Sequence, residues 1–221
     1  MDIAQKGLAD TAYTEIKTNI LNLTYTPGSP LSEAGLAAEL ALGRMPVRLA
    51  IKRLKAEGWL TAEFRCQTKV KGITAKDITE IYQLRRLLEE HALMLIFKNG
   101  LTWDYSFRLE EKLLKIKAAR GDLFARELAE SAWHLEMLKA LGNERVEHIY
   151  GTLQEETVRI ALSYMRREDE AYIENIINGL ERFCLALREK RFEEARLILE
   201  RDHWQGGQTQ ALAALAADHG Q

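Results

Sequence analysis

The chain has 221 residues, 47% of them hydrophobic, and its 31 Lys/Arg and 33 Asp/Glu give a formal net charge of −2. That length allows one large domain or two small ones with well-filled cores. Cysteine occurs only as Cys66 and Cys184, which argues against a disulfide framework and predicts a cytoplasmic protein. Residues 1–10 lack signal-peptide features, and no stretch approaches the roughly 18 uncharged apolar residues of a membrane span, so we expect no membrane association.

The N-terminal part begins with a predicted helix over residues 10–23, whose inner face carries Ile16, Ile20 and Leu23. Residues 26–30 contain two of the three prolines and predict a turn. Residues 36–40 form a second, short amphipathic helix, and residues 41–43 separate it from the next one. Two helices joined by a short segment containing Gly are typical of a helix-turn-helix.

The helix that starts near Arg44 has two faces of different character. Arg44, Arg48 and Lys52 recur at every fourth position and form one basic stripe. Pro46 lies in the first turn, where its missing N–H costs nothing. The opposite face is apolar and is expected to be core, with Val47, Ala50, Ile51 and Leu54. A basic stripe alone also fits an ordinary solvated helix face, so the interpretation depends on the residues C-terminal to this helix.

Two short strands come after this helix, over residues 59–62 and 69–71, with a polar turn at residues 64–68 between them. A helix-turn-helix followed by a hairpin is a winged helix. Residues 44–71 contain eight Lys/Arg and two acids, a local charge of +6 in a chain of net charge −2. A basic patch confined to one small module predicts binding to nucleic acid.

The remainder of the chain contains no proline and is predicted to be helical. We therefore expect a mainly α protein with two domains, a winged helix-turn-helix over residues 1–72 and an all-helical bundle of about six helices over residues 73–221. The first domain carries a charge of +3 and the second −5, so only the first is suited to phosphate. The predicted bundle helices span residues 75–98, 103–119, 123–141, 144–166, 168–189 and 192–216.

Two features of the predicted bundle suggest a polar site. Glu130 and His134 are four residues apart and project from one face of a helix. Arg85 falls on the apolar face of its helix, where a guanidinium needs a partner. That partner is either an internal carboxylate, such as Glu130 or Glu181, or the carboxylate of a bound ligand. His134 is equally consistent with a hydrogen-bonded core histidine.

These residues resemble those of a known family. Pro27-Gly28-x-x-Leu31-x-Glu33-x-x-Leu36-Ala37 and Arg44-x-Pro46-Val47-Arg48-x-Ala50-x-x-x-Leu54-x-x-x-Gly58 resemble the DNA-binding domain of GntR-family bacterial transcription regulators. The second half resembles the helical ligand-binding domain of the FadR/VanR-type branch, through an acidic start at Asp77, then Arg85 and Leu88-Glu89, and later Glu130, His134 and Gly142-Asn143. The resemblance covers residues 10–203. Its departures are Gly43, where the family usually has a Ser helix cap, and Gln67, where the wing usually has a Gly.

The resemblance implies a homodimeric repressor of a metabolic or catabolic operon, which binds a double-stranded DNA operator and a small organic acid effector. It implies effector contacts from Arg85, Glu130 and His134. In metal-binding members, an Asp and three His hold a divalent cation such as Zn²⁺, Ni²⁺ or Mn²⁺. The residues implied to contact DNA are Ser32, Arg44, Met45, Pro46, Arg48, Lys52, Gln67, Thr68 and Lys69.

The metal ligands implied by the resemblance are Glu130, His134, Glu181 and His203, with Glu181 placed by counting about 22 residues back from His203. Another register would place Leu180 and Asp202 at those points and break the site. Two rival interpretations are a helical metal-binding enzyme and a helical interaction protein with an incidental basic hairpin. The enzyme is the weaker rival because the sequence offers no nucleophile motif and no second acid/His pair to act as a general base.

Overall fold

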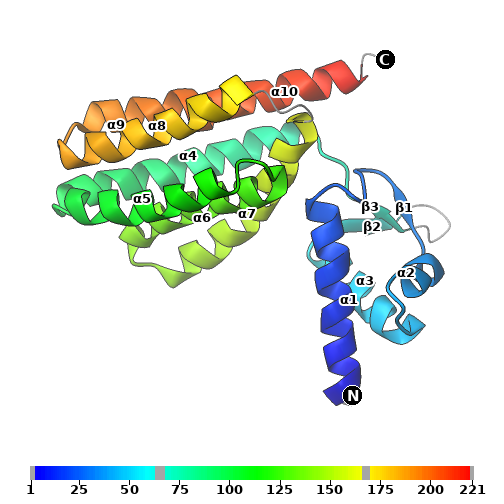
Figure 1. Ribbon diagram of the computed structural model, residues 1–221. Coiled ribbons are helices and arrows are strands. Elements are labelled where there is room, and N and C mark those ends of the chain that lie inside the picture. The colour runs from blue at the N-terminus through cyan, green and yellow to red at the C-terminus, as the bar shows by residue number, and fades with distance from the viewer. Residues whose placement is uncertain (1–2, 63–67, 166–169, 220–221) are drawn as a thin grey trace. The chain divides into compact units, whose positions relative to one another are not determined.

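The computed structural model describes residues 3–62, 68–165 and 170–219. It forms two compact units, Met1–Ile73 and Thr74–Gln221 (Figure 1). The mainly α fold class, a winged helix-turn-helix followed by a helical bundle, is confirmed. The N-terminal unit contains α1 (Ile3–Leu21), β1 (Pro30–Leu31), α2 (Glu33–Glu39), α3 (Arg44–Ala56), β2 (Leu60–Ala62) and β3 (Thr68–Val70).

The sheet of the N-terminal unit has the strand order β1-β3-β2, and both pairings are antiparallel. Leu60 of β2 lies opposite Val70, and Pro30 of β1 lies opposite Lys69. The sequence did not predict β1, because two residues beginning with Pro carry no alternating pattern. It forms as an edge strand where its proline is tolerated.

The core of this unit is built on α3, whose apolar face is buried as predicted. It packs mainly against α1, whose Ile16 and Ile20 are fully buried. The prediction that Leu23 continues the inner face of α1 is wrong. The helix ends at Leu21, and Leu23 has a left-handed backbone with φ of 63°.

The second unit consists of helices that match the predicted segments closely, except at the end of the chain. There the last predicted helix is divided by a π-helical segment, Leu199–Trp204, between α9 and α10. Among the described residues, no helix is long and apolar enough to cross a membrane. The helices are α4 (Ala75–Lys98), α5 (Thr102–Ala118), α6 (Leu123–Leu138), α7 (Glu144–Tyr164), α8 (Glu170–Arg188), α9 (Phe192–Ile198) and α10 (Gln205–His219), with a 3₁₀ turn at Lys139–Leu141.

The helix α4 organises the second unit. It begins at a capping box in which Thr74 accepts the N–H of Asp77 and Asp77 accepts that of Thr74. Along its length it packs against α6, α7, the π segment and α10 (Figure 1). Polar residues buried between these helices form the candidate functional site.

Candidate functional site

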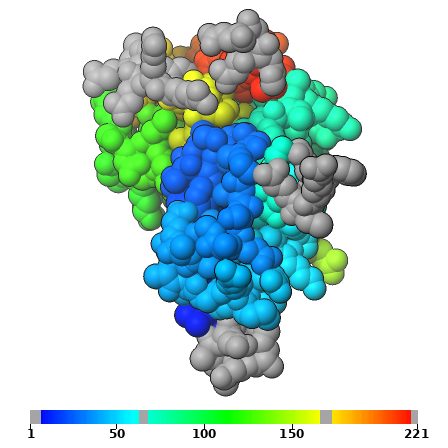
Figure 2. All heavy atoms as spheres, turned by 90° about the vertical axis from the view of Figure 1, so that its right-hand side faces the viewer, coloured from blue at the N-terminus to red at the C-terminus, as the bar shows by residue number. Residues whose placement is uncertain are grey.

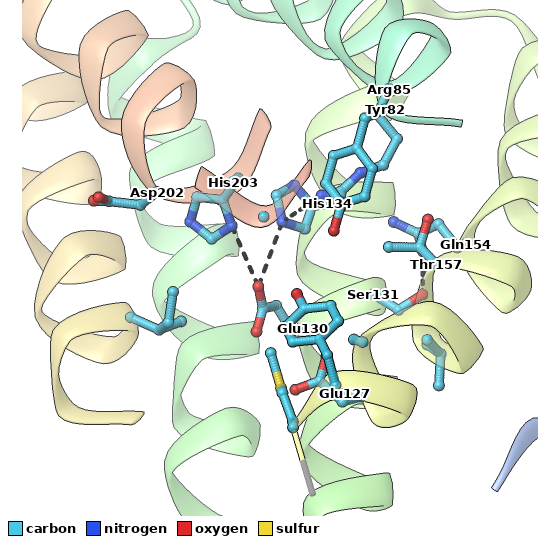
Figure 3. Close-up of a pocket in the computed structure, with 16 residues that line it drawn as sticks. Tyr82, Arg85, Glu127, Glu130, Ser131, His134, Gln154, Thr157, Asp202 and His203 are labelled. Atoms are coloured by element: carbon cyan, nitrogen blue, oxygen red, sulfur yellow. Dashed lines mark hydrogen bonds and ion pairs between the residues drawn. The ribbon is translucent and has the colours of Figure 1, made fainter. Parts of the chain in front are cut away.

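The centre of the helical unit holds a carboxylate between two imidazoles. Glu130 Oε1 lies 3.2 Å from Nδ1 of His203 and 3.9 Å from Nε2 of His134 (Figure 3). Each residue offers one ligating atom, and these atoms lie within 4.8 Å of one another. Both histidines are buried, so the cluster is inside the protein. One carboxylate and two imidazoles at this spacing are a donor set for a divalent transition metal.

Two elements deliver these three side chains. Glu130 and His134 lie one turn apart on α6, as predicted from their spacing. His203 comes from the π segment between α9 and α10, which is 69 residues further along the chain. π segments are rare and are frequently found at functional sites.

A second buried carboxylate, Glu89 of α4, contacts the cluster through His134. It accepts hydrogen bonds from Arg85 Nε at 3.0 Å, from Trp204 Nε1 at 2.9 Å and from the Tyr150 hydroxyl, and it has no solvent exposure. Its Oε2 lies 3.0 Å from Nδ1 of His134. Burial alone would raise the pKa of Glu89, but His134 and Arg85 hold that pKa well below its usual range.

The contact with Glu89 determines how His134 can act. Its Nδ1 lies against the Glu89 carboxylate, and its other ring nitrogen, Nε2, faces Glu130. Arg85 Nη2 lies 3.2 Å from that Nε2. Burial opposes a charge on His134, but Glu89 outweighs burial and raises the pKa of His134. A carboxylate behind a ligating histidine is the usual support in metal sites.

The sequence prediction missed Glu127, which lies one turn before Glu130 on α6. It is buried, and its Oε1 accepts from Arg126 Nη2 at 3.2 Å. Burial, together with the charge of Glu130, raises the pKa of Glu127 to about 8. By contrast, hydrogen bonds from His134 and His203 outweigh burial and hold the pKa of Glu130 well below its usual range. Burial therefore favours the neutral form of Glu127, whereas the two histidines favour the charged form of Glu130.

A small cavity of about 40 Å³ adjoins the cluster. A cavity of this kind needs roughly 10–15 Å³ to hold one water, so this one has room for an ion with a water or two. A larger ligand would require the helices to separate. The cavity is lined by mostly polar side chains, including Tyr82, Arg85, Ser131, Gln154, Thr157 and Tyr164.

The prediction that Glu181 is a metal ligand is wrong. Glu181 does not join the cluster, because its side chain is 47% exposed and pairs with Lys117. The neighbouring Leu180 is buried and apolar, and among the described residues of α8 only Ile176 lines this cavity. Asp202, the residue of the alternative register, lines the cavity but pairs with Arg201 at 2.6 Å.

The partner of Arg85 is an internal carboxylate, which is one of the two alternatives that the sequence left open. That carboxylate is Glu89, four residues further along the same helix, and not Glu130 or Glu181. The sequence contained a signal for this pair in its i,i+4 spacing, but such pairs are also common on exposed helix faces. Only the burial of both side chains shows that this pair is internal.

On the N-terminal unit, the predicted basic stripe is exposed. Arg44, Met45, Arg48 and Lys52 all lie on the outer side of α3. Arg48 Nε lies 3.0 Å from Glu33 Oε2, and both side chains are well exposed, so the pair is weak and separable. In Figure 2 the α2 and α3 segment of this unit, in light blue, forms a continuous rounded surface. A convex helix surface with a basic stripe suits the major groove.

The other residues predicted to contact DNA are placed differently. Ser32 is exposed, but its Oγ accepts a backbone N–H in the first turn of α2 and caps that helix. Pro46 and Thr68 are buried, which leaves their side chains no surface for DNA. Lys69 is half-buried on β3, and Gln67 lies outside the described residues.

Comparison with known proteins gives two family matches. Residues 8–70 match the model of bacterial regulatory proteins of the gntR family, and residues 80–204 match the FCD domain. The gluconate operon transcriptional repressor of Bacillus subtilis is 28% identical over 182 residues, which cover 80% of this chain and 74% of that protein. The HTH-type transcriptional regulator YdhC of the same organism is 37% identical over 84 residues, 38% of each chain.

Solved structures share the fold. A putative GntR transcriptional regulator from Rhodococcus has a TM-score of 0.74 at 21% identity, with 93% of this chain and 98% of that chain covered. The E. coli protein McbR/YncC has a TM-score of 0.70 at 20% identity, with 96% and 98% covered. The chain belongs to the gntR family of bacterial regulatory proteins, with an FCD domain as its helical unit, and is a DNA-binding transcription regulator.

Proposed function

We propose that this regulator represses a metabolic operon and releases its operator when a small organic acid enters the cavity of the FCD domain. The observation that carries the proposal is the buried cluster of Glu130, His134 and His203 beside a polar cavity. Ionisable groups are costly to bury unless they are paired or bind a metal, and this cluster gathers them beside a cavity that would have to widen to admit an organic acid. Relatives named as a gluconate operon repressor and a probable D-xylose utilization operon repressor support a metabolic target. Such a regulator would act in the bacterial cytoplasm.

The residues present fit a divalent metal, such as Zn²⁺, Ni²⁺ or Mn²⁺. Glu130, His134 and His203 would hold it, because a carboxylate oxygen and two imidazole nitrogens already lie within 4.8 Å of one another in the cluster. A bound cation would supply positive charge and open coordination positions for the carboxylate of an organic acid. Arg85 faces the same cavity and adds a second positive charge for that carboxylate.

Operator binding would use two copies of the chain, each contributing one α3 to the major groove of a half-site. Helices α4 and α5 support this proposal, because they expose large apolar side chains that a partner would cover, among them Leu87, 66% exposed, and Trp103, 60% exposed. A ligand that fits one spacing of the two DNA-binding units better than another would shift the population between them.

The test is thermal stability with and without ligand, followed by operator affinity. A set of small organic acids is tested, each alone and with Zn²⁺, Ni²⁺ or Mn²⁺. Each ligand is ranked by how far it raises the melting temperature of the protein. The stabilising ligands are then added to protein bound to its operator, identified by selection from random DNA. We expect at least one acid to raise the melting temperature and release DNA, and sedimentation to give a mass near twice 25.3 kDa. A monomer, or a protein indifferent to every acid and metal, would contradict the proposal.

A further inference from the structure

The helix that carries His203 changes register just before the site. The buried residues Ala195 and Ile198 of α9, and Leu199 at the start of the π segment, follow the spacing of a regular α-helix. Continued at 3.6 residues per turn, that spacing would next bury position 202. The structure instead buries His203 and leaves Asp202 partly exposed and paired with Arg201. From there the inward face continues through Trp204, Gly207 and Ala211, one residue later than a regular helix would place it.

The register change comes from the π segment Leu199–Trp204. At its end, the N–H of Gln205 donates to the carbonyl oxygen of Glu200, five residues earlier instead of four. The wider turn accommodates one additional residue. In a regular α-helix each residue advances by about 100°, so without the π segment His203 would turn away from Glu130. Trp204 would likewise lose its hydrogen bond to Glu89.

A glycine is required for this turn. A Cβ on Gly206 would lie 2.1 Å from the carbonyl oxygen of Arg201. That oxygen belongs to the backbone of the π segment, so the clash can be relieved only by moving the segment itself. Glycine inside a helix is also less favourable than alanine by about 1 kcal/mol. The need for a wider turn explains why a glycine nevertheless occurs at this position.

We propose that Gly206 is a positioning residue. Its missing side chain permits the π segment, and the π segment places His203 beside Glu130 (Figure 3). It also places Trp204 beside Glu89. The part of this proposal that concerns metal affinity rests on the proposed function. The part that concerns the placement of Trp204 stands independently of it.

The direct test is Gly206→Ala in the full chain, observed through the indole N–H of Trp204 in a ¹H–¹⁵N spectrum. The chain has four tryptophans, and Trp204→Phe assigns the signal. We expect Gly206→Ala to shift this signal, to speed its exchange with solvent and to weaken Zn²⁺ or Ni²⁺ binding at least tenfold. The matched control is Gly151→Ala on α7, where a Cβ would meet nothing within 4 Å, and we expect it to leave both measurements unchanged.

A rescue variant distinguishes loss of register from general damage. Deleting Asp202 in the Gly206→Ala background removes the additional residue, so a regular α-helix then brings His203 and Trp204 to the inward positions. We expect the indole signal and metal affinity to return toward wild type, even if Gly206→Ala alone fails to fold. An unchanged indole signal in Gly206→Ala, or a deletion variant no better than Gly206→Ala, would overturn the proposal. A wild-type protein that binds no metal would contradict the proposed function and leave the indole test intact.

Discussion

The two units of the molecule present their functional residues in opposite ways. On the N-terminal unit, Arg44, Arg48 and Lys52 lie on the solvent side of one helix, and their arrangement depends on that helix alone. In the FCD domain, Glu130, His134 and His203 are buried and come from two distant segments, with Glu89 of a third helix behind them. The comparison teaches that an exposed binding surface tolerates local change, whereas a buried one is part of the core.

The largest expected effect comes from a substitution of Glu89, in the buried site. Glu89→Gln removes the charge that faces Arg85 and His134, and leaves the buried guanidinium of Arg85 uncompensated. We expect the unfolding free energy of the FCD domain to fall by about 3–5 kcal/mol, as measured by urea denaturation. Glu181→Gln is the matched control, because its pair with Lys117 is exposed and contributes about 0–1 kcal/mol. Equal stability of the two variants would show that the buried network is not essential.

This contrast also explains what the sequence could predict. Helix α4 was predicted at its observed bounds because its periodicity and its capping residues are local. The pairing of Glu130 with His134 was predicted because both lie on one turn. By contrast, Glu89 joins Tyr150 and Trp204 across 61 and 115 residues of sequence, and no local pattern carries such contacts.

The incorrect ligand has a similar explanation. Glu181 was chosen by a residue count back from His203, and that count says nothing about which way either helix faces. The described structure turns Leu180 inward and Glu181 outward on α8. The π segment could not be predicted from the sequence either, because a wider turn depends on a single glycine and on the tertiary packing around it.

The next effect concerns the exposed surface. Arg48→Ala should weaken specific operator binding by about 1–3 kcal/mol if Arg48 contacts a guanine in the major groove. Because Arg48 is exposed and its pair with Glu33 is weak, the melting temperature should remain unchanged. Fluorescence anisotropy on a labelled operator gives the affinity. Arg120→Ala in the FCD domain removes the same charge from another exposed pair and should leave operator affinity nearly constant. Equal losses in both variants would mean that Arg48 acts only through net charge.

A smaller effect is expected from pH, and it concerns only the buried region. The pKa of Glu127 is raised to about 8, so the folded chain binds a proton there that the unfolded chain releases near pH 4.5. The folded state therefore loses stability from this group as pH rises from about 4.5 to 8. Glu127→Gln keeps a neutral group and removes that loss.

The measurement is the melting temperature of Glu127→Gln minus that of the wild type, taken at several pH values. We expect the difference to grow between pH 5 and pH 8.5, because the wild type loses over that range the stability that the protonated Glu127 contributes. The opposite dependence of Glu89 and Glu130, whose lowered pKa values make them lose stability as pH falls, is present in both proteins, so the difference isolates Glu127 and its interaction with Glu130. A difference independent of pH would show that Glu127 is ionised in the folded state.

The smallest effect is expected from a substitution of Gly43, in the exposed DNA-binding unit. Gly43 is the N-cap of α3, has an extended backbone and offers no side-chain hydrogen bond to the helix. A Cβ there would meet only Cδ of Pro46, at 3.6 Å, which is ordinary contact. Gly43→Ser would supply an oxygen for the free N–H groups of the first turn and should stabilise the N-terminal unit by a few tenths of a kcal/mol. Gly43→Ala adds the same Cβ without the oxygen and should be the less stable of the two. If serine gave no advantage over alanine in urea denaturation, the N–H groups of that turn would already be satisfied by water, and the cap would matter only when DNA is bound.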